Sequence, residues 1–197
     1  MTTQKQPTGA PQDATPPVPA LGAAPPRRTY EVAALREDGS LLATQLKAPT
    51  SPLFEAAFGA LSGNTVLDAT SGPIAIENLQ PGDRLRTQSG PGAEVIWIGT
   101  TTFVPADIGR RVSLVRVMTD TFGPSQPESF VTLGPAARIA RPLRSGTVAR
   151  EQLLTPAQHL VDRRYVISIT APTPITLFRL CLTQHAGIFA NCLPVET

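Results

Sequence analysis

Apolar residues beyond residue 28 occur in short runs, and Gly, Pro or Ser separates nearly every run from the next. Examples are residues 94–98, 165–169 and 175–182, in which β-branched residues are common. The chain carries 21 Pro and 15 Gly, and such punctuation is typical of strands joined by tight turns. The sequence therefore predicts a mostly β domain of irregular short strands.

The first 28 residues differ in composition from the rest of the chain. Seven of the prolines lie there, beside Thr, Gln and Ala and with almost no large apolar side chains. A segment of this kind cannot bury enough apolar surface to offset the entropy lost on ordering. We therefore expect residues 1–28 to form a disordered, proline-rich tail.

Two local signals organise the segment that follows. The dipeptide Asp38-Gly39 separates two strand-like runs and is typical of a hairpin turn, which predicts a β-hairpin over residues 29–50. Ser51 before Pro52 is a typical helix start, because Ser caps free N–H groups and Pro suits the first helical position. One short helix should thus open a β domain over residues 51–197.

Charge and hydropathy argue against several partners. Net charge is +2, and Arg110-Arg111 and Arg163-Arg164 are isolated pairs, whereas nucleic-acid-binding surfaces cluster their basic residues. No apolar run approaches the roughly 18 residues that span a bilayer, and the start of the chain lacks the apolar stretch of a signal peptide. We expect a cytoplasmic protein without nucleic-acid or membrane partners, with non-classical secretion left open.

Cysteine and histidine are too sparse to predict a metal site. Cys181 and Cys192 lack close spacing, and His159 and His185 are the two histidines. A structural zinc site needs four ligands with close pairs, so we expect no metal and no other cofactor. The cysteines should be buried free thiols, with a disulfide between them as the alternative. No motif predicts a small-molecule ligand.

Six ordered motifs carry a family resemblance. They are NTVL followed by GP (64–73), IENLQPGDRL (76–85), VIWIG (95–99), FVTLGPAAR (130–138), LTPAQHLVD (154–162) and HAGIFANCLPV (185–195). In this order they resemble the Hint (hedgehog/intein) family, in particular its short bacterial Hint_2-type proteins. The resemblance implies a horseshoe of short strands with pseudo-twofold halves, preceded here by one short helix.

The resemblance also implies a self-cleavage chemistry whose residues can be sought. A Cys or Ser attacks the carbonyl before it, a His protonates the departing nitrogen, and donors polarise the carbonyl oxygen. Placing Thr65 on the family's threonine puts Ala60 at the nucleophile position and Ala137 at the histidine position. Gly134 then stands where a Ser or Thr would assist, and Glu196-Thr197 replaces the His-Asn pair of inteins.

These replacements predict an inactive domain. Three separate roles lack a reactive side chain, and loss of a nucleophile alone costs on the order of 10⁶ in rate where a catalytic triad was dissected. We therefore expect a structural or interaction module of this self-processing family, not an enzyme, with an unidentified protein partner.

An alternative retains the family chemistry. Ser62 becomes the nucleophile if the register slips, with His159 in place of the missing histidine. The competing expectation is a turn position for Ser62 and an exposed short helix or turn for His159. His185 either orients a backbone carbonyl near the site or is a hydrogen-bonded structural residue.

Two further residues are expected to be structural. Asp83 follows Pro81-Gly82 and should lock a tight turn by accepting backbone N–H bonds. Trp97 lies in a run of β-branched residues and should belong to the core.

Overall fold

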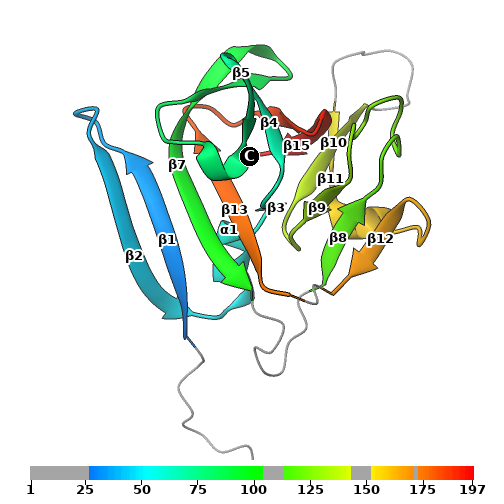
Figure 1. Cartoon of the computed structure of the whole chain (residues 1–197), viewed down its shortest axis with the longest axis horizontal. Helices are drawn as coiled ribbons and strands as arrows, with labels where there is room; N and C mark the ends of the chain where they lie inside the picture. Colours follow the sequence, from blue (N-terminus) through cyan, green and yellow to red (C-terminus); the bar gives the residue numbers. More distant parts are fainter. Residues whose placement is uncertain (1–26, 104–112, 143–151, 171–172) are drawn as a thin grey trace, which may run out of the picture.

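A computed structural model describes residues 27–103, 113–142, 152–170 and 173–197 (Figure 1). Within these ranges the chain is mostly β, as predicted. The predicted tail lies outside the described residues except for its last two, and so does the Arg110-Arg111 pair.

The first sheet holds the strands that surround the candidate site. Their bounds are β1 (Arg27–Leu35), β2 (Leu41–Pro49), β3 (Leu61–Ser62), β7 (Gly90–Phe103), β8 (Leu114–Val117), β9 (Val131–Leu133), β12 (Val166–Ile169) and β13 (Ile175–Leu182). They pair antiparallel in the order β2–β1–β7–β13–β3–β9–β8–β12. Residues 61–62 thus join β13 to the β8–β9–β12 part of the sheet.

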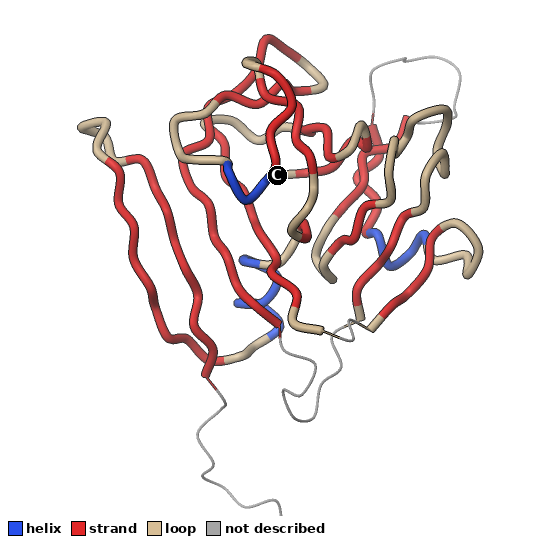
Figure 2. The backbone as a smooth tube through the Cα atoms, viewed as in Figure 1, coloured by secondary structure: helices blue, strands red, loops and turns tan. Residues whose placement is uncertain are grey.

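The second sheet holds the remaining strands, and Figure 2 draws the strands of both sheets in red. Their bounds are β4 (Val66–Ala69), β5 (Gly72–Ala75), β6 (Arg84–Thr87), β10 (Arg138–Pro142), β11 (Gln152–Pro156), β14 (Gly187–Ala190) and β15 (Leu193–Glu196). The order is β11–β10–β15–β14, and β14 continues onto β4 and β6. β6 pairs with the start of β7, so β7 belongs to both sheets. One large apolar core joins the two sheets through residues such as Leu85, Val95 and Leu133.

Three short helical segments complete the described fold: α1 (Pro52–Phe58) and the 3₁₀ turns η1 (Ile76–Asn78) and η2 (Ala157–Leu160). The predicted start of α1 is confirmed, because Ser51 Oγ accepts the Phe54 N–H at 3.4 Å and Pro52 is the first helical residue. None of the described helices has the length and apolar character needed to cross a membrane.

The predicted turn at Pro81-Gly82-Asp83 is confirmed in detail. Gly82 adopts φ +101°, which is accessible to glycine without strain. Asp83 Oδ2 accepts the Gln80 N–H at 2.8 Å, and the Asp83 N–H returns to the Gln80 carbonyl at 3.1 Å. The Asp83 carboxylate therefore closes the turn that leads into β6.

The N-terminal hairpin turns at Asp38-Gly39, where Gly39 has φ +80°. β1 also pairs with β7, with Tyr30 opposite Thr101, so the hairpin extends the first sheet at the left of Figure 1. A second apolar cluster covers this joint and consists of Tyr30, Ala48 and Phe58, with Trp97 packed against it. The division of the chain into a separate unit over residues 29–50 remains a prediction.

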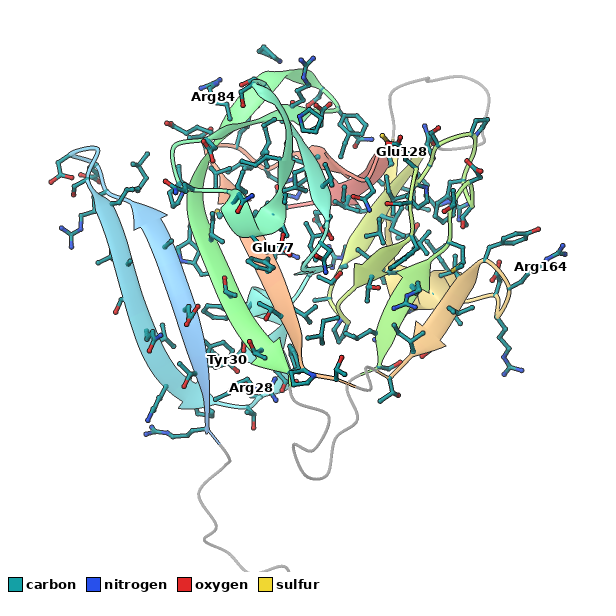
Figure 3. The ribbon with its side chains drawn as sticks, in the orientation of Figure 1. Arg28, Tyr30, Glu77, Arg84, Glu128 and Arg164 are labelled. Atoms are coloured by element: carbon teal, nitrogen blue, oxygen red, sulfur yellow. The ribbon has the colours of Figure 1, made fainter. Side chains whose placement is uncertain are left out.

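Arg28 ties the start of β1 to the body of the domain. Its Nη2 lies 3.9 Å from Glu55 Oε1, and its guanidinium lies 4.1 Å from the centre of the Phe103 ring, at the foot of the hairpin (Figure 3). The expectation that residues 1–28 form a tail therefore needs correction at its end. Because β1 begins at Arg27, the last two residues belong to the sheet.

Two truncations test this boundary. Deleting residues 1–26 should leave the thermal midpoint unchanged, because that segment carries almost no large apolar side chains. Deleting residues 1–28 should cost about 1 kcal/mol, since it removes the Arg28 contacts with Glu55 and Phe103. Thermal unfolding of both proteins measures the difference, and equal midpoints would contradict the assigned role of Arg28.

Trp97 belongs to the second cluster but is only half-buried. Its ring meets Phe58 edge-on at 5.3 Å between centroids. It also covers Gly99, where an added Cβ would lie 2.1 Å from Trp97 Cη2. Trp97 therefore packs on the joint between the hairpin and β7 rather than in the main core.

Trp97→Ala should destabilise the fold by about 2–3 kcal/mol, below the cost of removing a fully buried Trp, because part of the ring stays in water. Urea unfolding measures the loss. Leu41→Ala is a suitable control, since Leu41 is exposed at the hairpin end and should change stability by less than about 0.5 kcal/mol. A loss below about 1 kcal/mol for Trp97→Ala would mean that the ring is a surface contact residue.

Candidate functional site

In the sequence, the expected cleavage site falls at the peptide bond before Ala60. It joins Gly59, the C-cap of α1, to Ala60, which leads directly into β3. Ala60 is 3% exposed. Its N–H donates to the Phe178 carbonyl at 2.9 Å, and its carbonyl accepts the Gly134 N–H at 2.8 Å. The junction is therefore held on both sides by backbone hydrogen bonds.

Gly134 lies directly against the carbonyl of Gly59. A Cβ added at position 134 would lie 2.1 Å from the Gly59 oxygen and 2.8 Å from the Gly59 carbon. Both contacts are with backbone atoms, so the clash could be relieved only by movement of the backbone itself. Position 134 thus approaches the carbonyl that precedes Ala60, but only glycine fits this arrangement.

Ala137 lies in the same turn as Gly134. Its N–H donates to the Gly134 carbonyl at 3.2 Å, its own carbonyl accepts the Ala157 N–H at 3.0 Å, and it is 2% exposed. The structure therefore brings the three aligned positions together: Ala60 bonds to Gly134, and Gly134 bonds to Ala137. Ala60 and Ala137 carry only methyl groups and Gly134 has no side chain, so none of the three residues can attack a carbonyl or transfer a proton through a side chain.

Ser62 and Thr65 lie just beyond the junction. Ser62 is 5% exposed and lies in β3, where it pairs with Leu177 of β13. Its predicted position in a turn is therefore wrong. The reason is that the strand partner of Ser62 lies far away in the sequence. Thr65 is 2% exposed, and its Oγ1 donates to the Ser62 carbonyl at 2.6 Å. Thr65 therefore stabilises the turn between β3 and β4.

The two histidines lie outside the strands, His159 on η2 and His185 between β13 and β14. His159 is exposed on η2, as the structural reading predicts, and across the described residues it forms no hydrogen bond with Ser62. His185 is exposed, and its Nε2 lies 2.9 Å from Glu196 Oε1. Arg138 Nη1 lies 3.5 Å from the other oxygen of Glu196. His185 is therefore a hydrogen-bonded residue that helps to fix the last strand.

The cysteines differ from the prediction in one respect. Both are free, as expected, but both are exposed rather than buried. Cys181 alternates with the buried residues Leu180 and Leu182 along β13, which turns its side chain outward. Although Cys192 is exposed by surface area, partial loss of solvent around its sulfur raises the pKa of the thiol, and the nearby carboxylates of Glu128 and Asp68 raise it further. The Cys192 thiol is therefore a poor nucleophile near neutral pH. In the described ranges, no three His, Cys, Asp or Glu residues gather as metal ligands would.

Asn191 is a key residue that sequence reasoning missed. It is 7% exposed at the turn between β14 and β15 and has φ +46°. Its Oδ1 accepts the Val66 N–H at 2.7 Å, and its Nδ2 donates to Ser129 Oγ at 2.8 Å and to the Phe130 carbonyl at 3.3 Å. Asn191 thus connects β4, the β14–β15 turn and the segment before β9. The signal available in the sequence was an Asn at a turn between two apolar runs.

Asn191→Ala should destabilise the domain by about 2–4 kcal/mol, because it leaves buried polar groups unsatisfied and places Ala at a positive φ. Chemical denaturation measures the loss. Asn64→Ala is a matched control, since Asn64 has φ +61° but is exposed, and it should cost only about 1 kcal/mol. Equal losses for the two variants would show that the side-chain bonds of Asn191 contribute nothing.

Comparison with known protein families identifies the domain that contains this junction. The model of the Hint domain matches residues 60–197, so the match begins at the junction residue Ala60. The chain belongs to the Hint domain family. The Hint-type β fold predicted from the six motifs is therefore confirmed, and Ala60 stands at the first matched position of the domain.

A comparison with solved structures also finds similarity. The solution structure of a bacterial intein-like domain from Clostridium thermocellum is similar over 71% of this chain and 99% of that chain, with 13% sequence identity and a TM-score of 0.42. No curated protein matches the chain.

Proposed function

We propose that this Hint domain does not cut its own backbone and serves as a structural or interaction module. The observation that supports the proposal is the Gly59–Ala60 junction, where the aligned positions are adjacent but chemically silent. Acyl transfer needs a heteroatom beside the attacked carbonyl, and an alanine methyl group supplies none.

The hydrogen bonds of the junction support the same proposal. The nitrogen that would depart is that of Ala60, and its N–H is a donor to Phe178 within the sheet. The Gly134 N–H, the nearby donor, bonds to the carbonyl of Ala60 and not to that of Gly59. The Gly134 N–H therefore donates to the carbonyl that follows the Gly59–Ala60 bond, so it cannot stabilise an oxyanion on Gly59.

Self-cleavage at Ser62 is the second candidate function. Ser62 lines a cavity of about 550 Å³, which gives its side chain access to a small space. One feature opposes this function, since Leu61 and Ser62 are both paired with β13. A break between Leu61 and Ser62 would therefore separate a paired strand.

Intact mass spectrometry of the purified full chain tests the proposal. We expect one species with the mass of the uncut chain, in wild type and in Ser62→Ala alike. Fragments that end at Leu61 and begin at Ser62, present in wild type and absent from Ser62→Ala, would establish the second function. A third pattern, with a cut before Ala60, would contradict both functions.

A further inference from the structure

The cavity beside Ser62 is lined in part by charged and aromatic side chains that have no role in the self-cleavage chemistry described above. It measures about 550 Å³, within the range of small-ligand sites. Its lining includes residues of β3, β13, β8 and β9. Two charged side chains of opposite sign, Arg116 and Glu77, face this space together with the aromatic rings of Phe130 and Phe178.

Arg116 is held in place by two contacts. It lies on β8 opposite Thr132, its Nε donates to Thr132 Oγ1 at 3.3 Å, and its guanidinium lies 4.7 Å from the centre of the Phe130 ring. These contacts use the Nε and the face of the guanidinium. The fork of terminal Nη groups, which matches a carboxylate, is used by neither contact.

Glu77 lies on η1 (Figure 3) and is one of the residues that line the cavity. Its Oε1 accepts the N–H of Asn64, which fixes the carboxylate beside the β3–β4 turn. Over the described ranges of the chain, Arg116 and Glu77 line one cavity without forming an ion pair with each other. Two fixed and opposite charges that do not neutralise each other create a field that favours a dipolar ligand.

We propose that this cavity binds a dipolar ligand with the chemistry of a short peptide, whose carboxylate meets Arg116 and whose ammonium group meets Glu77. The proposal rests on the module function above and specifies its partner class. The rings of Phe130 and Phe178 contact the apolar part of the ligand, and the Thr132 hydroxyl orients the guanidinium.

Titration of the ¹⁵N-labelled full chain at low salt tests the proposal with three matched probes. Triglycine carries both charges, N-acetyl-triglycine lacks the cation, and triglycinamide lacks the carboxylate. Triglycine should shift amide signals around Arg116, Thr132 and Glu77, and each capped probe should bind on the order of tenfold more weakly. Equal affinities for the three probes, or shifts confined to other surfaces, would overturn the proposal.

Variants assign each charge to its residue. Arg116→Gln should bind triglycine and triglycinamide equally, and Glu77→Gln, which keeps an acceptor for Asn64, should bind triglycine and N-acetyl-triglycine equally. Arg116→Lys keeps the charge and replaces Arg116→Gln if that variant does not fold. It should retain the preference for triglycine over triglycinamide while binding more weakly than wild type, because the fork is lost. Unchanged discrimination in Arg116→Gln and Glu77→Gln would overturn the proposal.

One further probe identifies the source of the charges. N-acetyl-Lys-Gly-Glu-amide carries both charges on side chains, as an internal segment of a partner protein would. Stronger binding of this peptide than of triglycine supports the proposed site with an internal segment as its ligand, and the reverse order supports it with free peptide ends. A chain that stays uncut yet binds no probe contradicts this inference alone, whereas a chain that cuts itself contradicts the module function.

Discussion

Incubation with hydroxylamine or dithiothreitol should leave the chain as a single intact species. Both reagents cleave a protein at an ester or thioester, which forms when a side-chain oxygen or sulfur takes over the acyl group of the preceding residue. Ala60 has no such atom, so the Gly59 acyl group has no acceptor. The expected deficit against a complete catalytic unit is on the order of 10⁶ in rate. Intact mass after prolonged incubation at neutral pH is the measurement.

The double variant Ala60→Cys with Ala137→His returns two missing groups to a site whose backbone is otherwise unchanged. We expect it to cleave slowly before residue 60 in dithiothreitol, because the thiol then adjoins the Gly59 carbonyl while Gly134 still lacks an assisting hydroxyl. Ala60→Cys alone should be slower still, since no acid assists the departing nitrogen. Cleavage of the wild-type chain at this bond under the same conditions would contradict the proposed silence.

Local chemistry allowed much of the fold to be predicted. The Asp38-Gly39 turn, the Ser51 cap and the Pro81-Gly82-Asp83 turn depend on neighbouring residues only, and all three are present. The mostly β class followed from short apolar runs between turn residues. The order of the motifs identified the three aligned site positions along the chain. These positions are also neighbours in the fold.

Features that depend on distant partners could not be predicted in this way. Ser62 looks like a turn residue beside Gly63, yet its neighbour in the sheet is Leu177. The exposure of Cys181 follows from its alternation with buried residues along β13, a signal that composition alone overlooked. The bonds of Asn191 reach Val66 and Ser129 across the fold. The positions of Ser62 and Asn191 are decided by tertiary pairing rather than by local preference.

Gly134 was identified from the sequence, but the reason for a glycine at this position depends on a distant partner. Sequence comparison marked it as a lost hydroxyl, whereas the structure gives the position a packing role. Its φ lies outside the positive region, so backbone conformation does not explain why this position is a glycine. The close approach to the Gly59 carbonyl requires it. The same approach explains why regaining the family's Ser or Thr here would require α1 and the β9–β10 turn to separate.

Gly134→Ser should therefore destabilise the domain by about 3 kcal/mol or more, because an added Cβ 2.1 Å from the Gly59 oxygen must displace backbone. Gly90→Ser is the matched control. Its φ is also outside the positive region, and a Cβ there meets only Thr87 Oγ1 at 3.8 Å, so the cost should stay within about 0.5 kcal/mol. Urea unfolding of both variants measures the difference. If Gly134→Ser matched Gly90→Ser, the two segments would be free to separate, and the junction would be open enough for an assisting hydroxyl to return.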